Sequence, residues 1–308
     1  MPQRAKTTEF LAGAGLLLTT VIWGFAFVVV KNSLDLIPPI YMLAFRFTIA
    51  SLALALLYVR RLRRLDLALC RNGAVLGLFL FLAYVLQTIG CKYTTAGKNA
   101  FLTTVYVVLV PFLGWALLKK RPAPRSVPAA LLAMVGIGLL SLQGDLRLGL
   151  GDGLTLLCGV AFALHILYIG KYAVRQDPVL LTLVQLAVAA LLSWLLAPLL
   201  EGGFPEAALH PSVVGGMLYL GLFSTMLGFL LQNVGQKYVR PAPAAVLLST
   251  ESLFGVVFST LLLHESLSPR MWLGCGLIFL AVLLSETGLG LDPLLERLGG
   301  GKGRSAAG

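Results

Sequence analysis

Ten apolar runs, each about as long as a membrane-spanning helix, follow one another along this sequence of 308 residues. Crossing a hydrocarbon core about 30 Å thick takes roughly 20 mostly apolar residues in a helix. Only 12% of the residues are charged, whereas soluble domains carry about 25%. Because the runs lack the alternation of barrel strands, they indicate helices. The runs cover residues 11–31, 38–59, 73–91, 98–118, 126–143, 153–172, 178–200, 212–232, 241–263 and 270–288.

The 24 Lys and Arg residues are distributed unevenly between the loops. When the loops are assigned to alternate sides, 18 basic residues lie on the side of both termini and five on the other. The remaining one, Arg46, lies inside the second run. By the positive-inside rule, both termini are predicted to be cytoplasmic in a bacterial-type cytoplasmic membrane. The net charge of +11 therefore indicates orientation in the lipid bilayer, and no nucleic-acid partner is predicted.

Motifs for metal, redox or enzymatic chemistry are absent from the sequence. The four cysteines lie in different segments and form no C-x-x-C pair, so neither a metal cluster nor a disulfide framework is indicated. No H-E-x-x-H motif and no paired aspartate cluster occurs. We therefore predict no metal, no cofactor and no enzymatic activity.

Two nearly identical stretches show that the chain repeats itself. "QTIGCKY" at 87–93 returns as "QNVGQKY" at 232–238, 145 positions later. A drift of six residues then aligns Trp23 with Phe162 in the earlier spans. Each copy contains five runs, and this odd number makes the second copy enter the membrane from the opposite side. We therefore predict ten transmembrane helices in two inverted five-helix repeats. Their predicted bounds are 1–145 and 146–290, followed by a cytoplasmic tail at 291–308.

Four stretches resemble a known family. They are "WGFAFVVVK" at 23–31, "FRF" at 45–47, "YTTAGKNAFLTTVYVVLVPF" at 93–112 and "APAAVLLSTESLFGVVFSTLLLHESLS" at 242–268. In these residues the chain is similar to the ten-helix EamA-type transporters of the drug/metabolite transporter superfamily, over nearly its whole length. The resemblance implies a carrier that exports amino acids, related metabolites or toxic organic compounds through a central cavity between the repeats.

The sequence departs from that family's patterns at two places. Members often carry Glu-Pro in the ninth span, but here Glu251 is followed by Ser252. The small four-helix relatives exchange cationic drugs for protons through a glutamate in the first span, and residues 11–31 contain no acid. The resemblance therefore supports no proton mechanism.

A polar stripe marks the fourth run. Asn99, Thr103 and Tyr106 are spaced i, i+4 and i+7, so one continuous helix would place them on a single face. Pro111 would free the carbonyl near Val107, a local break that a cavity tolerates. The stripe indicates either a substrate pathway or hydrogen bonding between helices.

Other polar and aromatic side chains within the runs are further candidates for the pathway. Packing is the alternative for the aromatic residues, and contact with lipid headgroups is the alternative for the glutamine. These candidates are Trp23, Tyr84, His165, Tyr168 and Gln232.

Two charges, Arg46 and Glu251, lie near the middle of their runs. Each costs about 2.5–3.5 kcal/mol at the bilayer centre, so each should face protein or water and have a partner. The repeat pairs Arg46 with neutral Gln185, which favours a structural tether. It places Glu251 opposite Tyr106, so both are expected to approach the central cavity. Glu251 would then load a proton, bind a cationic group or pair with Arg46.

Inverted repeats are recurrent in secondary transporters. The leading hypothesis is a transporter that moves a small amphipathic metabolite by alternating access, with export as the expected direction and aromatic or other bulky amino acids as the narrower expectation. An exporter of cationic toxic compounds is the alternative within this class. A passive channel and an integral-membrane enzyme are the alternatives from other classes. The coupling ion and the oligomeric state stay open.

Overall fold

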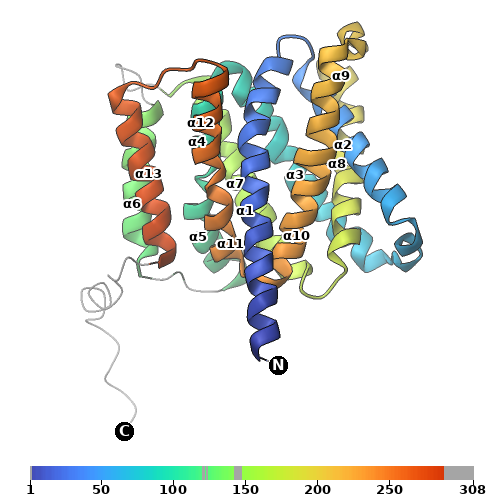
Figure 1. Ribbon diagram of the computed structural model, residues 1–308, viewed down its shortest axis with the longest axis horizontal. Coiled ribbons are helices and arrows are strands. Elements are labelled where there is room, and N and C mark those ends of the chain that lie inside the picture. The colour runs from blue at the N-terminus through green and yellow to red at the C-terminus, as the bar shows by residue number, and fades with distance from the viewer. Residues whose placement is uncertain (1, 120–121, 123, 142–147, 288–308) are drawn as a thin grey trace.

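The computed structural model describes residues 2–119, 122, 124–141 and 148–287, and this part of the chain is built from helices (Figure 1). Eight helices are long and apolar enough to cross a membrane, and Val127–Leu139 and Pro269–Ala281 are shorter apolar helices. Each of the ten predicted runs coincides with one of these segments. The prediction of an all-α membrane protein is therefore confirmed.

The first half contains six α-helices and one short 3₁₀ helix. In chain order they are α1 (Pro2–Ser33), α2 (Pro39–Leu57), η1 (Val59–Arg64), α3 (Leu67–Tyr93), α4 (Ala96–Thr103), α5 (Tyr106–Leu118) and α6 (Ser126–Ser141). The second half continues with α7 (Leu150–Tyr172), α8 (Pro178–Leu200), η2 (Glu206–Leu209), α9 (Pro211–Leu218), the π-helix η3 (Tyr219–Leu227), α10 (Gly228–Tyr238), α11 (Pro241–Ser249), α12 (Glu251–Leu262) and α13 (Pro269–Thr287).

The helix contacts repeat between the halves. Helix α3 packs on α7 as its counterpart α10 packs on α1, and α2 and α6 pack on their own counterparts α8 and α13. Helix α4 packs on α12, the counterpart of α5, and α5 packs on α11, the counterpart of α4. The C-terminal ends of α1 and α3 lie side by side, where Lys31 Nζ donates hydrogen bonds to the carbonyls of Cys91 and Thr94. Gly151, near the start of α7, lies against Tyr93. The second half therefore starts at the end of the molecule where α1 finishes, as an inverted repeat requires (Figure 1).

The fourth and ninth spans are each broken into two helices. Helix α4 ends at Thr103 and α5 begins at Tyr106, whereas α11 ends at Ser249 and α12 begins at Glu251. At each break a threonine hydroxyl donates to the carbonyl three residues earlier: Thr104 to Phe101 and Thr250 to Leu247, both at 2.7 Å. Such bonding competes with the regular helical ladder.

The fourth run forms one membrane span, Ala96–Leu118, but the local break expected from Pro111 lies earlier, at Thr104 and Val105. The break comes at the threonine, and Pro111 lies inside α5. The ninth span is interrupted in the same way although Ser252, rather than proline, follows Glu251.

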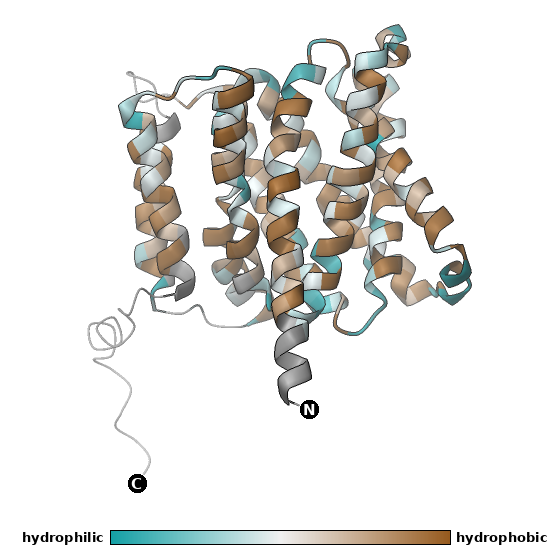
Figure 2. Ribbon diagram, in the orientation of Figure 1, coloured by the Kyte–Doolittle hydropathy of each residue, from teal (hydrophilic) through white to brown (hydrophobic). Residues whose placement is uncertain are grey.

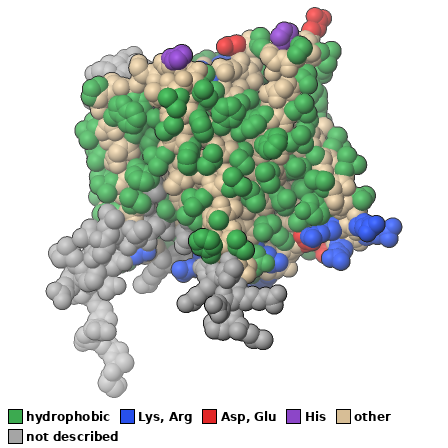
Figure 3. Space-filling view, viewed as in Figure 1, with side chains coloured by type: hydrophobic (Ala, Val, Ile, Leu, Met, Phe, Trp, Pro, Cys, Tyr) green, Lys and Arg blue, Asp and Glu red, His purple; other side chains and the backbone are tan. Residues whose placement is uncertain are grey.

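Charge and hydropathy divide the molecule into a central band and two ends. Hydrophobic residues cover the middle of the helices (Figure 2). Lys and Arg side chains gather at the end where α1 begins, and acidic and histidine side chains appear at the opposite end (Figure 3). We call these the basic end and the opposite end. The predicted boundary at 145/146, the tail at 291–308 and the basic residues Lys120, Arg121, Arg147, Arg297, Lys302 and Arg304 lie outside the described residues.

Candidate functional site

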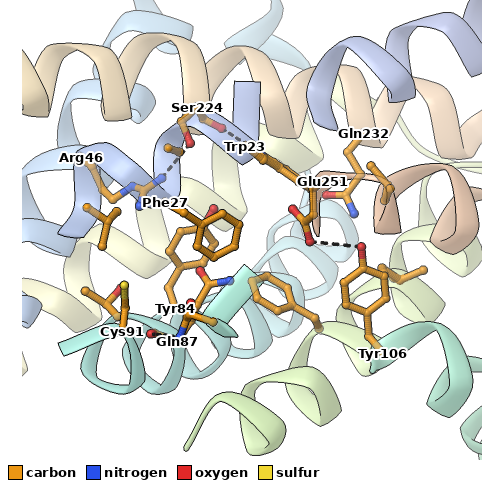
Figure 4. A pocket seen from close by; sticks show the side chains of 17 residues that line it. Trp23, Phe27, Arg46, Tyr84, Gln87, Cys91, Tyr106, Ser224, Gln232 and Glu251 are labelled. Carbon is orange, nitrogen blue, oxygen red and sulfur yellow. Dashed lines mark hydrogen bonds between the residues drawn. The ribbon is translucent and has the colours of Figure 1, made fainter. Parts of the chain in front are cut away.

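A pocket lies between the two halves (Figure 4). Its empty space is about 560 Å³, open solvent included. Helices of both halves contribute the aromatic side chains of its wall. They are Trp23 and Phe27 from α1, Tyr84 from α3, Tyr106 from α5 and Phe162 from α7.

Glu251 and Tyr106 meet at the pocket wall. The Tyr106 hydroxyl donates to Glu251 Oε1 at 3.2 Å, and the carboxylate side chain is only 4% exposed. Each residue begins the helix that follows its break. A carboxylate in the first helical turn interacts favourably with the helix dipole. The predicted approach of these two residues from opposing helices is confirmed.

Arg46 lines the same pocket from α2 and is 2% exposed. Its Nε donates to Thr225 Oγ1 at 2.9 Å, and its Nη2 donates to Ser224 Oγ at 3.0 Å. The guanidinium carbon lies 4.6 Å from the centre of the Tyr84 ring. Ion pairs join Arg61 to Asp177 and Lys98 to Asp152, whereas Arg46 and Glu251 form no ion pair with each other in this structure.

The π-helix η3 shapes the wall beside Arg46. Wider π turns often occur at functional sites. Here the Ser224 carbonyl accepts a 2.8 Å hydrogen bond from the Trp23 indole. A Cβ at Gly228 would lie 2.5 Å from the indole nitrogen, so only glycine leaves room for it. The sequence analysis missed Ser224 and Thr225, although this adjacent hydroxyl pair inside an apolar run was a usable signal.

The fourth-span stripe is divided between the pocket and the helix contacts. Asn99 lines the pocket, and its Nδ2 donates to Thr155 Oγ1 at 2.7 Å and to the Gln87 carbonyl at 3.2 Å. Thr103 Oγ1 accepts from Gln87 Nε2 at 3.1 Å and is outside the pocket lining. The two alternatives for the stripe thus both occur, at different residues.

The remaining candidates also separate into two groups. Trp23, Tyr84 and Gln232 line the pocket. His165 Nε2 and Gln185 Oε1 are 2.8 Å apart in the packed interior, outside its lining. Tyr168 is outside the lining too, and its ring lies 5.4 Å from that of Phe79.

The lining of the pocket reaches further along α3 than along its repeat counterpart α10. Thr88 and Cys91, near the end of α3, line it, whereas their repeat counterparts Asn233 and Gln236 are packed. The side-chain oxygens of Asn233 and Gln236 are buried and have no hydrogen-bond partner among the described residues. Buried hydrogen-bond acceptors toward the basic end are therefore left without partners among the described residues.

Comparison with known proteins identifies the family. The model of the EamA-like transporter family matches residues 11–142 and again 149–287. The chain belongs to the EamA-like transporter family. The double match agrees with a duplicated architecture. As an EamA-like protein the chain is a multi-pass membrane transporter and not an enzyme, so a small-molecule substrate and a lipid bilayer are its partners.

Individual relatives carry the same general description. An uncharacterized transporter of Archaeoglobus fulgidus is 35% identical, over 89% of this chain and 85% of the relative. The uncharacterized transporter YvbV of Bacillus subtilis is 26% identical, over 93% of this chain and 94% of its own length. A solved structure described as the crystal structure of a protein has a TM-score of 0.65 at 18% identity and covers 92% of this chain and 98% of its own. That structure supports the fold alone.

Proposed function

We propose that this EamA-like protein moves a small amphipathic metabolite across the cytoplasmic membrane by alternating access, in the direction of export. Aromatic or other bulky amino acids are the proposed substrates. Both termini are proposed to be cytoplasmic, because the basic end carries most of the Lys and Arg residues.

The observation that carries this proposal is the pocket shared by the two halves, with the Tyr106–Glu251 hydrogen bond at its wall. A site between inverted repeats can be exposed to either side by motion of one half against the other. Five aromatic rings suit an apolar substrate body. Asn99 Oδ1 and Gln232 Oε1, at the same wall, lack protein partners among the residues described and suit the polar group of such a substrate.

Glu251 favours one alternative, the export of cationic compounds. A carboxylate buried in an aromatic pocket can bind an organic cation through charge, and the rings add cation–π attraction. Under this alternative, a lipophilic cation such as tetraphenylphosphonium should be transported and phenylalanine should not.

Counterflow in liposomes tests the proposal and separates a carrier from a channel. Liposomes that contain the purified protein are loaded with labelled phenylalanine, and unlabelled phenylalanine is added outside. A carrier that exchanges substrate should lose label faster after this addition, since each returning carrier brings unlabelled substrate in. Label loss that the addition leaves unchanged indicates a channel, and loss equal to that from empty liposomes contradicts phenylalanine transport.

A further inference from the structure

We infer that Arg46 is the receptor for an anionic group of the substrate, a carboxylate in the first instance. The inference rests on the proposed function, because it assigns a substrate class to the same pocket. It replaces the tether predicted from the sequence with a binding role.

The bonds of Arg46 leave its charge unneutralised. Its two hydrogen-bond acceptors, Ser224 and Thr225, are neutral hydroxyls, and its third contact is the Tyr84 ring. The third guanidinium nitrogen, Nη1, makes no hydrogen bond within the described part of the chain. A planar guanidinium offers five donors, so this cation retains the capacity to bind another acceptor.

Burial makes this arrangement costly for a purely structural residue. A charged side chain within a membrane normally pairs with another charge or faces a pathway. Arg46 is 2% exposed, and no carboxylate of the described residues lies within ion-pair distance. A tether between α2 and η3 could be made by a neutral amide. The retained charge therefore points to a ligand that arrives in the pocket.

The geometry of arginine indicates the chemistry of that ligand. Guanidinium groups bind carboxylates through two parallel hydrogen bonds, which gives both strength and orientation. Phe27 and Trp23 line the pocket between Arg46 and Glu251 in the view of Figure 4. A ligand with a carboxylate at Arg46 and an aromatic body against these rings fits this arrangement, whereas a purely cationic ligand would be repelled by Arg46.

Three probes of similar shape separate the charges: phenylalanine is a zwitterion, 3-phenylpropionate an anion and phenethylamine a cation. Binding to the purified protein is measured by calorimetry for wild type, Arg46→Gln and Arg46→Lys. Arg46→Gln should lower the affinity for both carboxylate probes by at least about tenfold, or about 1.4 kcal/mol, and should leave the affinity for phenethylamine no lower than in wild type. Arg46→Lys should restore part of the loss, because it keeps the charge without the planar fork.

Arg61→Gln is the matched control, since Arg61 pairs with Asp177 away from the pocket. It should leave the binding of all three probes unchanged. Melting temperatures of all variants are measured beside binding. A structural tether alone would lower the melting temperature of Arg46→Gln and keep the wild-type order of affinities.

The outcomes separate this inference from the proposed function. If Arg46→Gln binds phenylalanine as tightly as wild type, the receptor role is wrong while amino-acid transport stands. If wild type prefers phenethylamine, the receptor role is wrong and the cation exporter is favoured. If wild type binds none of the probes, both the receptor role and the aromatic amino-acid assignment fail.

Discussion

The Tyr106 hydroxyl donates a hydrogen bond to Glu251 Oε1 at 3.2 Å, and the two residues are 145 positions apart in the chain. The same interval separates "QTIGCKY" from "QNVGQKY". Residues that occupy equivalent positions in the two repeats therefore touch each other. Such a contact lies close to the pseudo-two-fold axis, where the halves move relative to one another in an alternating-access cycle.

Replacement of Glu251 by glutamine is expected to abolish most substrate-driven transport while the protein still folds. The amide keeps the size of the side chain and an oxygen that accepts from Tyr106, but it loses the negative charge. We expect transport to fall at least about tenfold, about 1.4 kcal/mol of transition-state free energy. Transport rate against pH and melting temperature are measured together in liposomes and detergent.

The pH profile distinguishes two roles of the carboxylate. If Glu251 takes up and releases a proton during the cycle, the pH dependence of wild type disappears in Glu251→Gln. If it only binds a cationic group, wild type keeps a flat profile and the variant loses affinity. Wild-type rates and an unchanged profile in the variant would remove Glu251 from the mechanism.

Replacement of Tyr106 by phenylalanine is expected to slow transport, because Glu251 loses a hydrogen-bond donor. The change removes the hydroxyl that donates to the carboxylate and leaves a buried acceptor without that partner, at a cost of about 1–3 kcal/mol. Tyr168→Phe is the matched control, because Tyr168 lies outside the pocket lining. Initial transport rates normalised to folded protein should fall for Tyr106→Phe alone. Equal rates in both variants would mean that the hydrogen bond is dispensable.

The positions of the spans were predictable from the lengths of the apolar runs. The Tyr106–Glu251 contact was predictable from the alignment of the two repeats. The helix breaks were not, because they arise from short-range bonds of Thr104 and Thr250 that compete with the helical ladder. The hydrogen-bond partners of Arg46 were not predictable for a related reason. Its partners Ser224 and Thr225 lie in a π-helix, and the hydrophobic pattern of the eighth run does not indicate such a helix.

Gly24→Ala is expected to destabilise the contact between α1 and α12. A Cβ there would overlap Phe254 Cβ and lie 2.9 Å from the Gly255 backbone nitrogen, so the backbone must shift. Overpacking of this kind costs about 1–3 kcal/mol. Gly13→Ala, on the same helix, meets only Leu247 Cδ1 at 3.8 Å and serves as control. Melting temperature in detergent should fall for Gly24→Ala only, and equal values would contradict the tight contact.

Reporter fusions test the proposed orientation. A fusion after residue 65 follows the basic η1 segment and should be cytoplasmic by the positive-inside rule. A fusion near residue 207, in η2, should lie on the other side. A pair of reporters with opposite compartment requirements, one active in the cytoplasm and one outside it, gives a signal for each site. A cytoplasmic signal from residue 207 would overturn the topology.

The two ends of the pathway should open in turn. Two residues at equivalent positions of the repeats, Cys91 and Gln236, can report which end is open. Cys91 lines the pocket, and its counterpart 145 positions later, Gln236, is packed with an unbonded side-chain oxygen. Motion that opens the basic end would give that oxygen access to water. We therefore expect Gln236 to be reached from the basic end in the alternate state and Cys91 to be shielded in that state.

Thiol labelling measures this exchange. One variant keeps Cys91 and lacks the other three cysteines, and a second carries Gln236→Cys with all four native cysteines replaced. Both are treated with a membrane-impermeant maleimide in liposomes, with and without a phenylalanine gradient. A gradient that favours one state should raise the labelling rate at one position and lower it at the other, because a single motion exposes one and buries the other. Rates that rise together, or a cysteine at position 236 that stays unreactive in every gradient, would contradict alternating access through this pair.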